Sequence, residues 1–218
     1  MAQKAGNEKN ILVGASPLFI SNVDVTDTTN YKSATPNGSD DESVAFEATK
    51  SYTETLNNIT SGGFYFRNVG YTNNGLQITY NPTYDSVTVD QLLDTAKLFK
   101  SAMEVMIATE MSEGTLENVL VVFGQPSTTL SGGTLGLQAG ALGAQPTERQ
   151  LIAVGQAPTT VSSKSERVYY ARRVLSVQQS QFSLARTTPT TFPVTFRLLP
   201  DSDYADAEYG VIIDRTWS

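Results

Sequence analysis

The segment from residue 104 to 124 combines acidic and apolar side chains, and its residue types suggest chemistry more than any other part of the chain. Its acidic residues are Glu104, Glu110, Glu113 and Glu117. Two carboxylates catalyse glycoside hydrolysis when they lie about 5 to 10 Å apart. Glu104 and Glu110 would be separated by roughly 20 Å along a strand. This spacing argues against a catalytic pair, and we expect that the protein is not an enzyme.

The composition narrows the remaining chemistry further. The 218 residues include no histidine and no cysteine, so the commonest general base and the thiolate metal ligands are missing. The net charge is −7, and an acidic chain does not attract nucleic acid by counterion release. No apolar stretch reaches the roughly 18 residues of a membrane helix, and the N-terminus lacks the apolar core of a signal peptide. We therefore expect synthesis in the cytoplasm, and neither cofactor nor metal.

Two different periodicities meet within the 104–124 segment. Apolar and polar side chains alternate over residues 101–111, which predicts a strand with Glu104 and Glu110 on its polar face. Residues 115–123 have apolar side chains at spacings of three and four, which predicts a short helix ending at Gly124. The catalytic hypothesis therefore competes with a simple joint between a strand and a helix.

The start of this helix offers a structural role for the other two carboxylates. Glu113 and Glu117 lie where the positive end of the helix dipole favours acidic side chains. Ser112 or Thr115 can cap the first turn by accepting a backbone hydrogen bond. Glu113 and Glu117 are therefore interpreted as helix charges and not as reactive groups.

The rest of the chain has the pattern of short strands separated by turn residues. Residues 92–99 are expected to form a helical turn or a loop, and turns are expected at Asn73-Asn74-Gly75 and at residues 81–85. No linker and no repeat divides the chain. We therefore predict one mainly β domain over residues 1–218, with the single flanking helix at about 115–123. Further strands are predicted at 76–80, 86–91, 149–156 and 166–184, with two more after residue 190 that are joined by an acidic loop.

Residues 21–60 form a distinct acidic stretch, with seven acidic side chains against two basic ones. We expect a long exposed loop or β-hairpin excursion here, since long loops in compact domains are usually functional or disordered. Carboxylate clusters can also bind Ca²⁺, but neither cluster in this chain has EF-hand spacing, and solvated loops are the preferred interpretation. The two clusters are Asp40, Asp41 and Glu42, and Asp201, Asp203, Asp206 and Glu208.

A basic stretch between residues 161 and 190 is the counterpart of the acidic one. Basic residues mixed with tyrosines are typical of nucleic-acid binding, but the acidic chain as a whole argues against it. Scattered surface charges are an equally good interpretation. The alternative that we carry forward is contact between subunits, with the acidic 21–60 stretch of one copy against the basic stretch of another. The residues that would make this contact are Asp40, Asp41, Glu42, Glu47, Arg167, Arg172 and Arg173.

The order of these elements resembles the tail tube (major tail) proteins of long-tailed bacteriophages. The resemblance covers about residues 64–124 and 190–217, and it depends on the order of the motifs more than on any one of them. The segments that carry it are "VGYTNNGLQITYNPTYDSVTVDQLLDTAKLF", "AMEVMIATEMSE", "GTLENVLVVFG" and "VTFRLLPD" followed by "YGVIIDRTW".

The resemblance implies a β-sandwich or partly closed barrel with one flanking helix, acting as a structural subunit of the virion tail. Six copies would form a ring, and rings would stack with each other and with other tail proteins into a tube that conducts DNA into the host. Glu104 or Glu110 would face an acidic lumen through which DNA slides without specific binding.

Two other functions remain open at this point. A tail terminator would share the fold but stop the stack. A carbohydrate-binding or adhesion module would present an exposed aromatic platform with Ca²⁺. Tyr65, Tyr71, Tyr80 and Tyr84 could supply that platform, but their alternation places most of them in a core.

Overall fold

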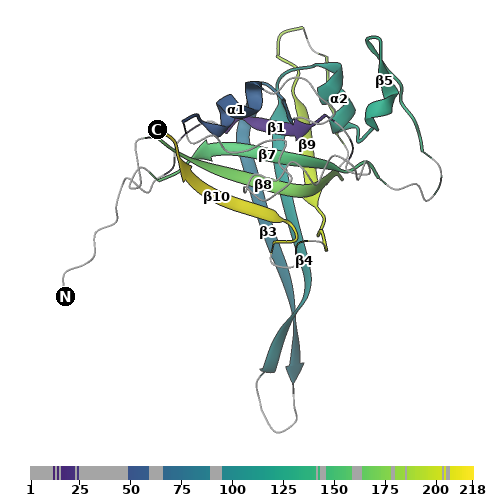
Figure 1. The fold of residues 1–218 in the computed structure, drawn as a ribbon. Helices are drawn as coiled ribbons and strands as arrows, with labels where there is room; N and C mark the ends of the chain where they lie inside the picture. Colours follow the sequence, from purple (N-terminus) through teal and green to yellow (C-terminus); the bar gives the residue numbers. More distant parts are fainter. Residues whose placement is uncertain are drawn as a thin grey trace.

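The described part of the chain is mainly antiparallel β structure (Figure 1). The computed structural model describes residues 12, 14, 16–22, 24, 49–58, 66–88, 95–140, 142, 146–158, 164–177, 180–184, 186–202, 204 and 207–218. Its strands are β1 (Leu18–Ser21), β2 (Phe66–Asn68), β3 (Thr72–Thr88), β4 (Thr95–Met111), β5 (Leu130–Ser131), β6 (Thr134–Leu135), β7 (Arg149–Gln156), β8 (Ser165–Ser176), β9 (Phe192–Leu198) and β10 (Gly210–Thr216). The helices are α1 (Tyr52–Asn58), α2 (Leu116–Val122) and the 3-10 turn η3 (Ser127–Thr129).

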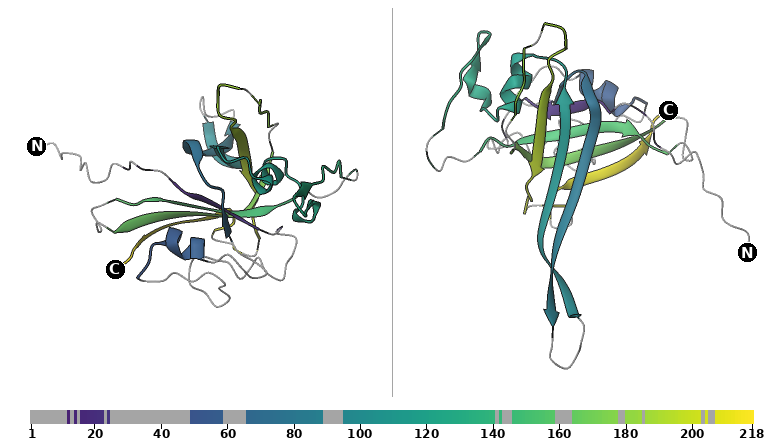
Figure 2. Two further views of the ribbon diagram at one scale, coloured as in Figure 1. Left: turned by 90° about the horizontal axis from the view of Figure 1, so that it is seen from above. Right: turned by 180° about the vertical axis from the view of Figure 1, so that it is seen from behind.

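One eight-stranded sheet contains every strand except the small β5–β6 hairpin. Its order is β2-β1-β7-β8-β9-β4-β3, and β10 pairs with β8 outside this path. β7 occupies one edge of β8, so the other edge is shared by β10 along Ser165–Ala171 and by β9 along Val174–Ser176. β9 and β10 pair with different parts of β8. The β9-β4-β3 branch of the sheet therefore runs across the β7-β8-β10 branch (Figures 1 and 2).

The β1-β7-β8 part of the sheet is buried on both faces. Successive side chains of β1 point to opposite faces of the sheet, so Leu18 and Ile20 belong to one apolar cluster and Phe19 to the other. The larger cluster joins this part of the sheet to β4, β9 and α2. The smaller one joins it to α1 and β2, with Tyr52 and Leu56 almost fully buried.

Helix α2 confirms the predicted helix and its cap. The Thr115 side chain accepts a hydrogen bond from the Asn118 backbone N–H at 3.2 Å, and Gly124 follows the helix with a φ of 62°. Asn118 is fully buried, and its amide donates to the carbonyl oxygens of Val69 and Glu113. Neither helix of the described residues is long and apolar enough to cross a membrane.

The prediction of a single helix is wrong, because Tyr52–Asn58 is helical. These residues fall within the predicted acidic excursion at 21–60, yet they pack into the core. The Tyr52 backbone N–H donates to Glu166 at 2.7 Å, and these two residues are 114 positions apart in the chain. A local pattern could not reveal this packing, because the partner of the helix lies on β8.

The two predicted turns within residues 73–85 are also wrong, because β3 is one strand of 17 residues. Asn74 and Gly75 have φ angles of 62° and 68°, and the β3–β4 register shifts beside them, so they form a bulge and not a reversal. β4 likewise begins at Thr95, so the end of the predicted 92–99 loop is strand.

The remaining strand predictions agree with the structure at β7, β9 and β10. The strand predicted at 166–184 is too long, because β8 ends at Ser176 and the described residues from 177 to 184 are not strand. The predicted strand at 101–111 corresponds to the C-terminal part of β4, and its alternation is confirmed. Val105, Ile107 and Thr109 are buried there, whereas Glu104 and Glu110 are partly exposed.

Candidate assembly surface

The β3–β4 hairpin projects far beyond the body of the protein (Figures 1 and 2). Beyond β4, the sheet continues only through β9, which pairs with Met106–Met111. Among the described residues, no strand pairs with the outer edge of β3 or with the Thr95–Val105 part of β4 on its second edge. Two strands alone are marginally stable in water, so this projection is a surface that a further strand or subunit would stabilise.

One face of the hairpin, here called the inner face, continues the apolar core outward. Tyr80 pairs with Val105, Tyr84 with Lys100, and Ser86 with Leu98, so these side chains alternate onto the same side. Tyr80, Tyr84 and Leu98 are 65%, 58% and 64% exposed. The face thus stays apolar after the body has ceased to cover it. Its members are Ile78, Tyr80, Pro82, Tyr84 and Ser86 from β3 and Leu98, Lys100, Met103, Val105 and Ile107 from β4.

The opposite face, here called the outer face, carries both carboxylates that the sequence places on one side of the strand. Glu104 lies 3.7 Å from Arg197 of β9. Glu110 accepts a hydrogen bond of 3.2 Å from the side chain of Asn73. The outer face is therefore polar and hydrated near the body, and part of its negative charge is offset by Arg197.

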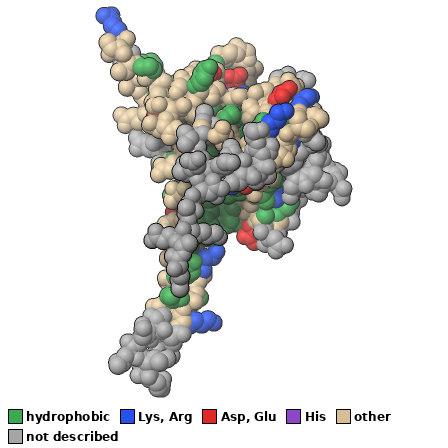
Figure 3. All heavy atoms as spheres, turned by 90° about the vertical axis from the view of Figure 1, so that its left-hand side faces the viewer, with side chains coloured by type: hydrophobic (Ala, Val, Ile, Leu, Met, Phe, Trp, Pro, Cys, Tyr) green, Lys and Arg blue, Asp and Glu red, His purple; other side chains and the backbone are tan. Residues whose placement is uncertain are grey.

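An apolar groove lies where the inner face meets the β8–β10 part of the sheet. Its cavity has a volume of about 410 Å³. Figure 3 shows hydrophobic side chains gathered at the base of the projection, with basic side chains farther out along it. Ile212 on the groove wall is 66% exposed and belongs to β10, an edge strand of the described sheet. The lining includes Ile78, Tyr80, Val105, Tyr169, Tyr209 and Ile212.

The three predicted contact arginines all have partners within the chain. Arg167 forms a bidentate pair with Asp214 of β10, and its hydrogen bonds lower the pKa of Asp214. Arg172 is buried, lies 3.5 Å from the centre of the Tyr204 ring and donates to the Ala207 carbonyl. Arg173 forms a bidentate pair with Glu148, at 2.6 and 2.9 Å. Their role between subunits stays a prediction.

The acidic residues predicted to contact other subunits lie outside the described residues. These are Asp40, Asp41, Glu42 and Glu47. Within the described part, no group of three or more acidic residues is arranged to hold a metal ion.

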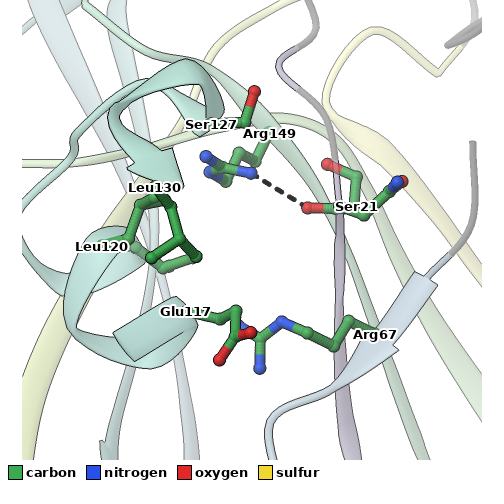
Figure 4. Close-up of a pocket in the computed structure, with 9 residues that line it drawn as sticks. Ser21, Arg67, Glu117, Leu120, Ser127, Leu130 and Arg149 are labelled. Atoms are coloured by element: carbon green, nitrogen blue, oxygen red, sulfur yellow. Dashed lines mark hydrogen bonds between the residues drawn. The ribbon is translucent and has the colours of Figure 1, made fainter. Parts of the chain in front are cut away.

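A smaller cavity of about 230 Å³ beside α2 contains Arg67, Arg149 and Glu117 (Figure 4). Arg149 already donates to the Ser21 carbonyl at 3.1 Å and pairs with Asp24 at 2.9 Å. Burial lowers the pKa of Arg149, while the charge of Asp24 raises it. Arg149 also donates to the Gln125 carbonyl at 3.3 Å, so its side chain links β1 and β7 to the segment after α2.

No protein-family model and no curated protein matches this chain.

The tyrosines of the hairpin differ from the sequence prediction, which placed most of them in the core. Tyr71, Tyr80 and Tyr84 are all exposed. Alternation correctly groups Tyr80 and Tyr84 on one face, but it cannot reveal where the covering layer ends. The groove was missed for the same reason, because it joins β3 and β4 to β8 and β10, about 100 residues later in the chain.

Proposed function

We propose that the protein is a tail tube subunit of a long-tailed bacteriophage, with the sandwich-like or partly closed barrel architecture of that family. Copies of the chain would form rings of six, and the rings would stack into the tube of the virion tail. This proposal combines the order of the sequence motifs with the shape of the β3–β4 hairpin.

The observation that carries the proposal is the projecting hairpin, whose inner face is apolar and whose outer strand edges pair with no other strand of the described residues. Full burial of a side chain such as Leu98 or Tyr84 contributes about 1.5 to 3 kcal/mol. A protein that worked as an isolated monomer would gain nothing from exposing these groups. Exposed edges of this length are also prone to uncontrolled pairing unless a partner covers them.

A subunit with different donor and acceptor surfaces makes heterologous contacts. Such contacts close into a ring when the rotation allows it and otherwise continue as an open stack. A tube needs both kinds of contact. The described surface offers separate candidates for them, namely the open strand edges and the apolar inner face.

The outer face suits the proposed lumen. Near the body it carries Glu104 and Glu110, and Arg197 lies 3.7 Å from Glu104. Farther out, the same face carries Val87, Lys97 and Phe99. Acidic groups repel the phosphates of DNA, so that DNA would slide along this face.

Electron microscopy of the purified protein over a range of concentrations tests the proposal. We expect hollow tubes of stacked rings. Single rings that never stack would instead indicate the tail terminator of the same fold, and a monodisperse monomer under every condition would refute both.

A matched pair of hairpin variants tests the observation itself. Tyr84→Asn with Leu98→Asn makes the inner face polar, whereas Thr79→Asn with Thr83→Asn leaves the outer face polar. All four sites are exposed, so both variants should fold, as circular dichroism will show. We expect the first to lose tube formation and the second to keep it.

A carbohydrate-binding module is the second candidate, and the exposed Tyr80 and Tyr84 favour it. Two aromatic rings on one face can stack against sugar rings. Binding to insoluble polysaccharides by the monomer, abolished by Tyr80→Ala, would support this function. Absence of binding together with tube assembly would reject it.

A further inference from the structure

We propose that the outer end of the inner face of one copy docks into the apolar groove of a second copy. The inference depends on the proposed assembly function and deepens it, because it names the two surfaces that meet. Leu98 would enter the groove beside Ile212, and Lys100 would lie against Glu208, which precedes β10.

The first reason is that both surfaces are apolar and lack a cover among the described residues. Leu98 and Tyr84 stand on the outer end of the inner face, and Ile212 and Tyr80 stand on the walls of the groove. The groove, with its volume of about 410 Å³, has room for side chains of this size. Burying both surfaces together would remove apolar area from water on each side.

The second reason is that a chain cannot fill its own groove with its own hairpin end. Tyr80 borders the groove, and Ser86 pairs with Leu98. The six residue steps from Tyr80 to Ser86 span roughly 20 Å in a strand. The hairpin points away from the body (Figures 1 and 2), so a hairpin end that enters the groove has to come from another copy.

The third reason is charge complementarity. Lys100 is the only charged side chain among the described residues on the outer end of the inner face. The segment 200–209 has no Lys or Arg and carries four acidic residues. Of these, Glu208 is exposed and directly follows Ala207, which lines the groove. A lysine arriving with Leu98 would therefore meet the carboxylate of Glu208 beside the groove.

The fourth reason is that both partners present strand edges. β10 is an edge strand of the described sheet, and the outer part of β4 has one unpaired edge. A hairpin lying in the groove would align its backbone with that of β10, as in recognition by strand addition. The contact is heterologous, since the hairpin end and the groove are different surfaces of one chain.

Cysteine cross-linking tests this contact directly, because the chain has no cysteine of its own. The double variant Leu98→Cys with Ile212→Cys should form a ladder of covalent trimers, tetramers and larger products under oxidising conditions. The two sites are too far apart in one chain for an internal disulfide, which needs Cα atoms within about 7 Å. Each single variant brings no two cysteines together at this contact, so it should stay largely monomeric and can give at most a dimer.

Three outcomes separate the possibilities. A ladder supports the inference. Tubes on the microscope grid without a ladder would overturn the docking contact and leave the proposed function intact. A double variant that stops at the dimer would mean a reciprocal, closed pairing, which also overturns the inference.

Charge reversal provides an independent measurement. Lys100→Glu should raise the concentration needed for assembly by roughly tenfold, since like charges at a contact oppose association. Lys97→Glu is the matched control, because Lys97 is exposed at the same end of the hairpin but lies on its outer face. Adding Glu208→Lys to Lys100→Glu should restore part of the loss. Equal effects of Lys100→Glu and Lys97→Glu would contradict the contact.

Discussion

Glu113 accepts a hydrogen bond of 3.0 Å from the backbone N–H of Tyr71, so the carboxylate joins the start of β3 to the segment before α2. The backbone N–H of Ser112 donates in turn to the Tyr71 carbonyl at 2.8 Å. Of the four carboxylates between residues 104 and 117, this one has the clearest structural task. It fixes the joint between the long hairpin and helix α2, which follows it in the chain.

The close approach of Glu113 to Gly70 gives the first prediction. A Cβ atom on Gly70 would lie 2.1 Å from the Glu113 carboxylate, and the φ of Gly70 is 82°. Gly70→Ala should therefore destabilise the fold through both the backbone and the clash. Gly75 is the matched control, with a φ of 68° and no atom within 4 Å of the added Cβ.

The two variants separate the two causes. Gly75→Ala should cost about 1 to 2 kcal/mol from the left-handed backbone alone. Gly70→Ala should cost at least about 1 kcal/mol more, as overpacking does. Urea denaturation measures both. Equal losses would show that Glu113 moves aside without cost.

Packing of α1 into the core gives the second prediction. Leu56 is 1% exposed, whereas Asn58 at the end of the same helix is exposed. Leu56→Ala should lower the free energy of unfolding by about 2 to 5 kcal/mol, and Asn58→Ala should change it by less than about 0.5 kcal/mol. If Leu56→Ala were equally harmless, α1 would not belong to the domain core.

The buried pair of Glu166 and Arg215 gives a prediction about pH. The carboxylate accepts from Arg215 at 2.8 Å and from the backbone of Tyr52, yet burial raises its pKa above the usual 4.5. The folded protein then binds this proton more tightly than the unfolded chain does. The contribution of Glu166 to stability is therefore full below pH 4.5 and is lost as the pH rises through the raised pKa.

The variant Glu166→Gln isolates this effect, because glutamine does not titrate. The stability of the parent protein minus that of the variant should fall as the pH increases from about 4 toward neutrality. Denaturation curves at several pH values measure the difference. A difference that rises with pH would reverse the assigned direction. The pKa of Asp214 is shifted in the opposite direction, because Arg167 lowers it. The contribution of Asp214 to stability is lost in acid, and this loss is the same in the parent protein and in the variant.

The proposed lumen gives the fourth prediction. In assembled tubes, Glu104→Cys and Glu110→Cys should react with N-ethylmaleimide but not with a large polyethylene-glycol maleimide, which cannot enter a narrow bore. In unassembled protein both reagents should react. Thr187→Cys, at an exposed site outside the hairpin, shows how an ordinary surface position behaves. Reaction of the large reagent with positions 104 and 110 in tubes would place them outside the bore.

Short, regular segments were predictable because their periodicity is local. The alternation from Glu104 to Glu110 placed two carboxylates on one face, and the spacing in residues 115–123 located α2 with its Thr115 cap. The continuity of β3 was not predictable, because Asn, Gly and Pro occur both in turns and at bulges or irregularities of a strand. Asn74, Gly75 and Pro82 therefore could not show which of the two structures forms. Helix α1 was not predicted for another reason, because its packing partner Glu166 lies on a strand that is distant in the sequence.

The sequence by itself determined the mainly β character, the position of α2 and the absence of histidine and cysteine chemistry. It also showed that Glu104 and Glu110 share a face, because alternation is a property of the strand alone. Only the tertiary structure decided that β3 and β4 extend beyond the layer that covers their inner face. Because β8 pairs with β9 at one end and with β10 at the other, the described residues leave the inner face uncovered beyond Tyr80 and form the groove beside Ile212. Where an apolar face loses its cover depends on the lengths and crossing of separate strands, and no local pattern records these.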